Sequence, residues 1–91
     1  MKKIYKYKLN LHHTATELHM PRGAKVLCVQ IDEKTGEPCI WALVDVRQTI
    51  MDSRLFFLHL TGLDINVEGK EYLGTVQLSG GGLIVHVFEK I

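Results

Sequence analysis

Apolar and polar residues alternate along most of this chain, and the alternation is broken at regular intervals by turn-forming residues. The pattern predicts β-strands near residues 3–11, 24–32, 38–46, 55–61, 71–78 and 83–89. Residues 14–20 are a candidate for a further short strand, and residues 47–54 are polar enough for a loop or one helical turn. We therefore predict an all-β fold, a small antiparallel barrel or sandwich of about six strands built from hairpins, in a single domain over residues 1–91.

Two pairs of strands are joined by short glycine-containing turns, at 32–37 and at 79–82. Because side chains alternate across a strand, each hairpin has one apolar face and one mixed face. The residues expected on the core faces are Leu27, Val29, Ile31, Ile40, Ala42, Val44, Tyr72, Gly74, Val76, Leu78, Leu83, Val85 and Val87. The strand at 55–61 adds Phe56, Leu58 and Leu60 to the core.

The mixed faces carry several large apolar side chains: Trp41, Phe57, Leu73, Ile84 and Phe88. Burying each is worth about 1.5–3 kcal/mol, so these faces are too apolar to remain in water. The N-terminal strand with its following loop could cover them, and so could another copy of the chain. We therefore expect a homo-oligomer.

The net charge and the length of the apolar runs limit the classes of function that we expect. The net charge is +1, and the lysines at positions 2, 3, 6 and 8 alternate with apolar residues. This favours an edge strand protected by lysines over a nucleic-acid-binding arm, so nucleic acid is not an expected partner. No apolar run approaches the roughly 20 residues of a membrane span, and the N-terminus does not resemble a signal peptide. The expected location is the cytoplasm.

Metal binding and disulfide formation are both disfavoured. His12, His13 and His19 with Cys28 or Cys39 have the chemistry of zinc ligands, but their spacing matches no closed site. The two cysteines are displaced along their strands, so no disulfide is predicted. We expect no metal and no cofactor.

Catalysis is likewise not expected. His59, His86, Thr75 and Asp32 all fall on mixed faces, where they could converge. Alternation alone, however, places any residue on such a face half of the time, and the glycine-rich segment at 79–82 leads into a strand instead of a helix. We interpret that segment as a hairpin turn and the protein as non-enzymatic.

Four segments together resemble a family of small uncharacterised proteins carried by tailed phages and prophages. They are KIYKY at 3–7, MPRGAKVLCVQ at 20–30, PCIWALVD at 38–45 and YLGTVQLSGGGLIVHVFE at 72–89. The resemblance covers most of the chain and departs from the family pattern between 47 and 70. It implies a setting, the cytoplasm of an infected host cell, and no activity.

In that setting, the first hypothesis is an accessory protein that interferes with a host factor through an aromatic surface on Trp41, Phe57 or Phe88. The first alternative is an oligomer that sequesters a small nucleotide signal in pockets between subunits, with arginines on its phosphates and Trp41 or Phe57 stacked on its base. The second is a minor structural component of the virion. The candidate binding residues are Trp41, Phe57, His59, His86, Phe88, Arg22, Arg47 and Arg54.

Overall fold

Seven β-strands make up the protein. The computed structural model describes the backbone of residues 1–91 and every side chain except that of Ser79. A single short 3-10 turn, η1 (Ser79–Gly81), joins the last two strands within this described part. The strands are β1 (Lys2–Lys8), β2 (Ala15–Pro21), β3 (Lys25–Asp32), β4 (Glu37–Asp45), β5 (Met51–Leu60), β6 (Lys70–Leu78) and β7 (Leu83–Lys90).

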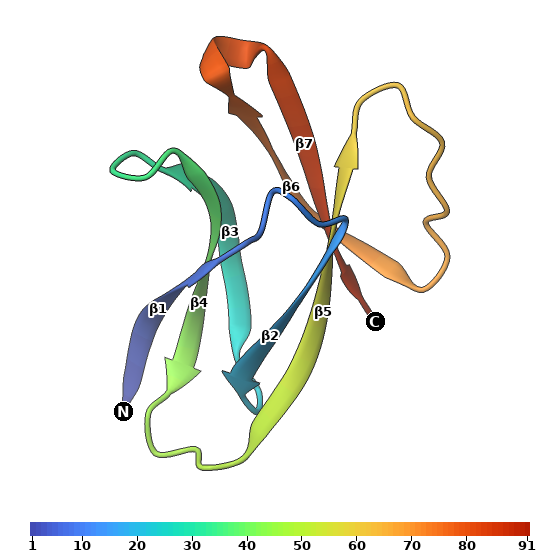
Figure 1. Ribbon diagram of the computed structural model, residues 1–91. Helices are drawn as coiled ribbons and strands as arrows, with labels where there is room; N and C mark the ends of the chain where they lie inside the picture. The colour runs from blue at the N-terminus through green and yellow to red at the C-terminus, as the bar shows by residue number, and fades with distance from the viewer.

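The strands form two antiparallel sheets. Sheet A has the order β1-β4-β3, and sheet B has the order β2-β5-β7-β6. Figure 1 shows the two sheets side by side, with the β6–β7 hairpin and the long loop between β5 and β6 extending from sheet B. The all-β fold built from hairpins is confirmed. It is a sandwich and not a closed barrel, and it has seven strands because residues 15–21 form a strand of their own.

The loop or helical turn predicted for residues 47–54 is wrong in its second half. β5 already begins at Met51 and pairs with β2 from Pro21 to Ala15. The polar sequence of this segment conceals a strand because Arg54 points inward, on the same face as Phe56 and Leu58, where it pairs with Glu89. An inward-pointing charge breaks the alternation on which the prediction depends.

The core lies between the two sheets and is built by the predicted faces. Between its turn and a bulge in its first strand, each hairpin keeps the expected partition: Val29 pairs with Ile40, and Val76 pairs with Val85. Leu60 and Leu83, which were also expected in the core, are exposed at the ends of β5 and β7. The buried apolar residues packed in one cluster are Leu9, Met20, Ala24, Val29, Ile40, Ala42, Val44, Phe56, Leu58, Val76, Leu78, Val85 and Val87. Burial of these side chains is the main force that holds the sheets together.

A β-bulge in β3 corrects the placement of Leu27. The register shifts between Val26 and Cys28, so Val26 packs against the core and Leu27 is 45% exposed. A bulge inserts one extra residue and reverses the face of what precedes it. Simple alternation cannot detect such an insertion.

A second bulge, in β6, corrects Tyr72 and Leu73. The register shifts between Tyr72 and Gly74, so Leu73 packs against the core while Tyr72 is 55% exposed on the outer face of sheet B. At Gly74 the two sheets approach closely, because a Cβ atom there would lie 3.4 Å from Cβ of Val29. This contact joins β6 to β3 across the sandwich.

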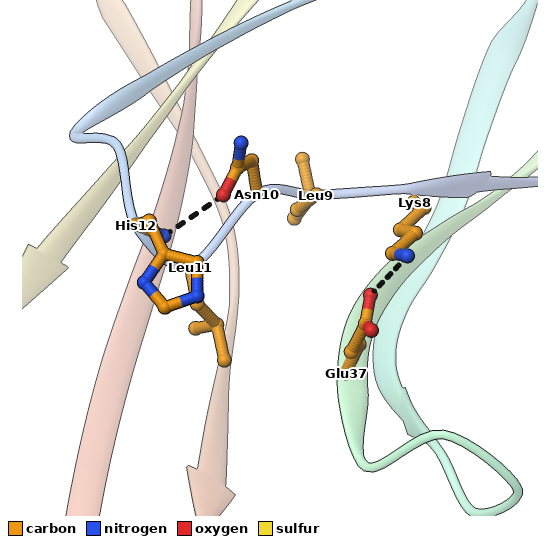
Figure 2. Close-up of a pocket in the computed structure, with 6 residues that line it drawn as sticks. All are labelled: Lys8, Leu9, Asn10, Leu11, His12 and Glu37. Carbon is orange, nitrogen blue, oxygen red and sulfur yellow. Dashed lines mark hydrogen bonds and ion pairs between the residues drawn. The ribbon is translucent and has the colours of Figure 1, made fainter.

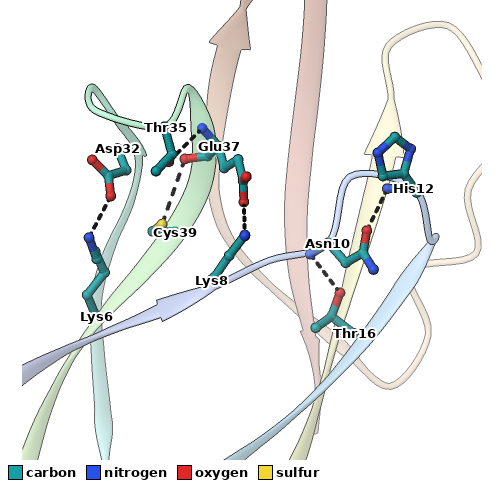
Figure 3. Close-up of polar contacts among 9 residues, drawn as sticks. All are labelled: Lys6, Lys8, Asn10, His12, Thr16, Asp32, Thr35, Glu37 and Cys39. Atoms are coloured by element: carbon teal, nitrogen blue, oxygen red, sulfur yellow. Dashed lines mark hydrogen bonds and ion pairs between the residues drawn. The ribbon is translucent and has the colours of Figure 1, made fainter.

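The N-terminal strand forms an edge of sheet A, as predicted, but covers neither mixed face. β1 pairs only with β4, from Lys2 opposite Asp45 to Lys8 opposite Cys39. Figure 3 shows its lysines reaching acids of the neighbouring hairpin, Lys6 to Asp32 and Lys8 Nζ to Glu37 Oε2 at 2.8 Å. The hydrogen bond from Lys6, followed by one from the backbone of Lys34, lowers the pKa of Asp32. Both mixed faces remain on the outside of the sandwich.

Candidate functional site

The outer face of sheet B gathers four of the eight candidate residues. Phe57 and His59 on β5 lie directly opposite Phe88 and His86 on β7, and Tyr72 on β6 lies opposite Phe88 from the other side. We call these five residues the aromatic surface. They come together because they occupy alternate positions of three adjacent strands.

The rings of the aromatic surface pack against one another. His59 stacks on Phe57 with ring centroids 6.3 Å apart, and it meets Phe88 edge-on at 5.6 Å. Tyr72 meets Phe88 edge-on at 5.4 Å. Offset-stacked and edge-to-face arrangements are the favoured geometries of aromatic pairs, so the surface is preorganised.

Hydroxyl groups engage both ring nitrogens of His86. Nδ1 lies 2.8 Å from Oγ1 of Thr75, which in turn lies 2.5 Å from the hydroxyl of Tyr72. Nε2 lies 2.7 Å from Oγ1 of Thr61, the first residue after β5. His86 therefore ties the β5–β6 loop to the sheet.

A hollow of about 240 Å³ opens between the aromatic surface and this loop. Its walls are formed by four residues of the aromatic surface, His59, Tyr72, His86 and Phe88, and by residues 60–63 and Ile65. Several exposed apolar side chains lie in the same stretch of chain: Leu60, Leu63, Ile65 and Val67. The hollow is thus an apolar depression with a polar patch where His86 and Thr61 meet.

One lysine reaches into the middle of the aromatic surface. The Nζ atom of Lys70, on β6, lies 4.3 Å from the ring centroid of Phe57 and 3.5 Å from Nε2 of His59, both on β5. Because β7 separates these strands, the lysine side chain spans it. An ammonium over an aromatic face is held by the electron density of the ring.

The pKa of His59 is lowered from its usual 6.5. Partial burial is the largest cause, followed by the positive charge of Lys70 and then by His86. Both kinds of environment disfavour the imidazolium form. At neutral pH His59 is therefore uncharged and accepts a hydrogen bond from Lys70.

We expect this shift to be measurable by NMR titration, with His59 protonating below pH 6.5. Between its folded pKa and 6.5 the unfolded chain binds more protons, so the stability that His59 contributes should fall as pH falls through this window. Lys70→Gln should raise the pKa of His59, whereas Lys34→Gln, in the remote β3–β4 turn, should leave it unchanged. An unchanged His59 titration in Lys70→Gln would contradict the electrostatic coupling.

Trp41 is not brought together with the other aromatic candidates. It lies on the outer face of sheet A, on the opposite side of the sandwich, between Lys6 on β1 and Cys28 on β3. The Nζ atom of Lys6 sits 5.7 Å from the indole ring centroid. The indole Nε1 is buried and forms no hydrogen bond with the described residues.

The three candidate arginines are all engaged by carboxylates. They form the pairs Arg22 with Asp52, Arg47 with Asp45, and Arg54 with Glu89. Hydrogen bonds from Arg47 lower the pKa of Asp45 to about 2. Among the described residues of a single chain, no arginine lies with Trp41 or Phe57 as the nucleotide hypothesis requires. Arg54 does lie 5.9 Å from the ring of Phe56, on the inner face of sheet B.

A larger hollow of about 340 Å³ lies at the far end of β1, lined by residues 8–12 and Glu37. Figure 2 shows that its charged groups satisfy each other, with Lys8 paired to Glu37. The amide side chain of Asn10 accepts a hydrogen bond from the backbone of His12. Among the described side chains, no three His, Cys, Asp or Glu residues are placed to hold a metal ion here or elsewhere.

Sequence reasoning missed Tyr72, Thr61 and Lys70 as parts of the site. The bulge hid Tyr72, and the contact of Thr61 with His86 depends on how the chain leaves β5. Lys70 reaches two strands away, so the strand order had to be known first. The only signal for Thr61 and Lys70 in the sequence is their position at the end of a strand that carries aromatic residues, and this signal is weak.

Fold and site together define a small two-sheet antiparallel β-sandwich with a preorganised aromatic surface on one outer face. The chain belongs to a family described as a domain of unknown function, DUF7352, whose model matches residues 1–91. Neither a curated protein nor a solved structure matches the chain. Within the described residues, no helix has the length and apolar character needed to cross a membrane.

Proposed function

We propose that this protein is a non-enzymatic binding protein that docks a partner protein on the aromatic surface of sheet B. One observation supports the proposal: the packed aromatic rings lie beside an apolar hollow, on a sheet face that no other strand covers. Aromatic residues in such surroundings dominate the binding energy of protein interfaces. The resemblance to small phage proteins makes a bacterial host factor, met in the host cytoplasm, the proposed partner.

The polar groups of the site support binding more than catalysis. Hydroxyls occupy both nitrogens of His86, and His59 faces an ammonium. Neither imidazole is oriented by a carboxylate within the described residues, which is the arrangement that a base in a catalytic triad requires. His86 and its hydroxyl partners therefore serve to hold the hollow in shape.

The nucleotide-sequestering alternative has less support. Arginine is the residue suited to bidentate phosphate contacts, and all three candidate arginines already pair with carboxylates. Self-association remains part of the proposal, with the outer face of sheet A, opposite the aromatic surface, as the surface that two copies could share. Native mass spectrometry would report the number of subunits directly.

Partner capture by aromatic variants tests the docking surface. Phe88→Ala should weaken capture of the partner from a bacterial host by tenfold or more, because an anchor residue of an interface contributes about 2 kcal/mol or more. The matched control is Trp41→Ala, an aromatic truncation on the opposite face, which should leave capture unchanged. The melting temperature of each variant should be measured alongside, so that only folded protein is compared.

Two results would contradict the proposal. One is full capture by folded Phe88→Ala and Phe57→Ala. The other is loss of capture in Trp41→Ala, which would move the docking surface to sheet A.

A further inference from the structure

The aromatic surface carries positive charge that the described residues do not neutralise. Lys70 and Lys90 are direct cross-strand partners on β6 and β7, and both point to the outer face beside Phe88. Neither takes part in any ion pair that the described residues form. Like charges directly opposite each other destabilise a sheet, and no ion pair among the described residues offsets that cost.

The carboxylates of this part of the molecule are directed elsewhere. Glu71 and Glu89 occupy the next cross-strand pair and therefore point to the inner face, where Glu89 binds Arg54. Glu17 lies on β2, at the far edge of the sheet, and contacts His19 at 3.3 Å. In the described part of the chain, Asp64 and Glu68 of the loop before β6 form no ion pair with either lysine.

The position of Lys70 leaves part of its ammonium group accessible to a ligand bound at the aromatic surface. Its ammonium lies over the ring of Phe57, and only one of its three donors faces Nε2 of His59. The remaining donors are free for an anion, and the apolar hollow beside Phe88 begins at His59. An anionic group and an apolar group of one ligand would therefore fit side by side.

We infer that the aromatic surface recognises an acidic segment of its partner protein, with an apolar side chain in the hollow and a neighbouring carboxylate on Lys70. This inference rests on the proposed docking function and deepens it. We favour a carboxylate over a phosphate because the arginines, the residues suited to bidentate phosphate contacts, are engaged by carboxylates. Charge complementarity of this kind orients a partner and rejects basic competitors.

Three small probes test the inference by NMR on the uniformly labelled protein. N-acetylphenylalanine carries a carboxylate beside an aromatic ring, N-acetylphenylalaninamide is its neutral counterpart, and phenyl phosphate replaces the carboxylate by phosphate. We expect N-acetylphenylalanine to shift the signals of Phe57, His59 and Phe88. It should bind about threefold to fivefold more tightly than the amide, the effect of one partly exposed charge pair.

Lys70→Gln should abolish the preference for N-acetylphenylalanine over the amide while leaving the amide bound. Lys25→Gln, which removes a lysine of sheet A, is the matched control and should preserve the preference. Raising the salt concentration should reduce the preference in the unmodified protein and in Lys25→Gln, because both keep Lys70. These three results together would support an acidic partner segment.

Several outcomes would overturn the inference. They are equal affinity for the acid and the amide, a preference that survives Lys70→Gln, tighter binding of phenyl phosphate, and absence of binding by all three probes. Sedimentation showing a dimer that Phe88→Ala dissociates would make a second copy the occupant and would also overturn it. If Phe88→Ala loses its captured partner but Lys70→Gln does not, the docking function stands and the acidic segment is wrong.

Discussion

Replacing Phe56 by alanine should lower the free energy of unfolding by about 3–5 kcal/mol, the typical cost of deleting a buried phenyl ring. Phe56 has no exposed surface and lies in the core cluster on β5, between β2 and β7. Truncation would remove its packing within the core cluster and leave a cavity. Urea denaturation, followed by circular dichroism, measures this loss.

The adjacent residue provides the control. Phe57→Ala makes the same chemical change one position along β5, but its ring lies on the outer face beside His59 and Lys70. Its cost should be about 1 kcal/mol or less, because the solvent can fill the space. Equal losses in the two variants would mean that the outer face of sheet B is buried in solution, as in a stable oligomer.

Glu89→Gln should destabilise the protein by about 3 kcal/mol, because it leaves the guanidinium of Arg54 inside the sandwich without a counter-charge. Glu89 is 8% exposed and accepts hydrogen bonds from Nε and Nη2 of Arg54, the latter at 2.8 Å. Arg54 Nη1 also donates to the carbonyl oxygen of Ala24 at 2.6 Å. The pair thus joins β5, β7 and the turn before β3.

Two further variants separate a buried pair from an exposed one. Asp52→Asn removes the exposed partner of Arg22 and should cost at most about 1 kcal/mol. Replacing both members of the inner pair, Arg54→Met with Glu89→Leu, should recover most of the stability that Glu89→Gln loses. If Glu89→Gln costs no more than Asp52→Asn, then water reaches Arg54 freely and the pair is not structural.

The candidate site divides sharply into what local pattern predicts and what it misses. Phe57, His59, His86 and Phe88 were assigned to one kind of face by alternation, and the structure places them together on one sheet. Trp41 was assigned by the same reasoning but belongs to the other sheet. Alternation identifies the face of a strand, and it carries no information about which sheet the strand joins.

The arginines show a different limit. Arg54 was expected at a ligand, yet it lies on the inner face and binds Glu89, which is 35 residues away along the chain. Arg22 likewise binds Asp52, which is 30 residues away, whereas Arg47 binds Asp45, only two residues away. A charged residue in a sequence reveals its charge, but its partner depends on contacts that form only on folding.

The amino-acid sequence by itself determined the all-β class, the two hairpins, which side chains share a face near their turns, and most of the core. These features follow from side-chain alternation and from glycines that permit tight turns. Only the tertiary structure decided the separation into two sheets, the β1–β4 and β2–β5 pairings, the two bulges, and the reach of Lys70 across β7. These features depend on contacts between distant parts of the chain, whose geometry no local pattern encodes. The aromatic surface forms because side-chain alternation places the rings of β5 and β7 on the same kind of face and the tertiary structure makes these two strands neighbours.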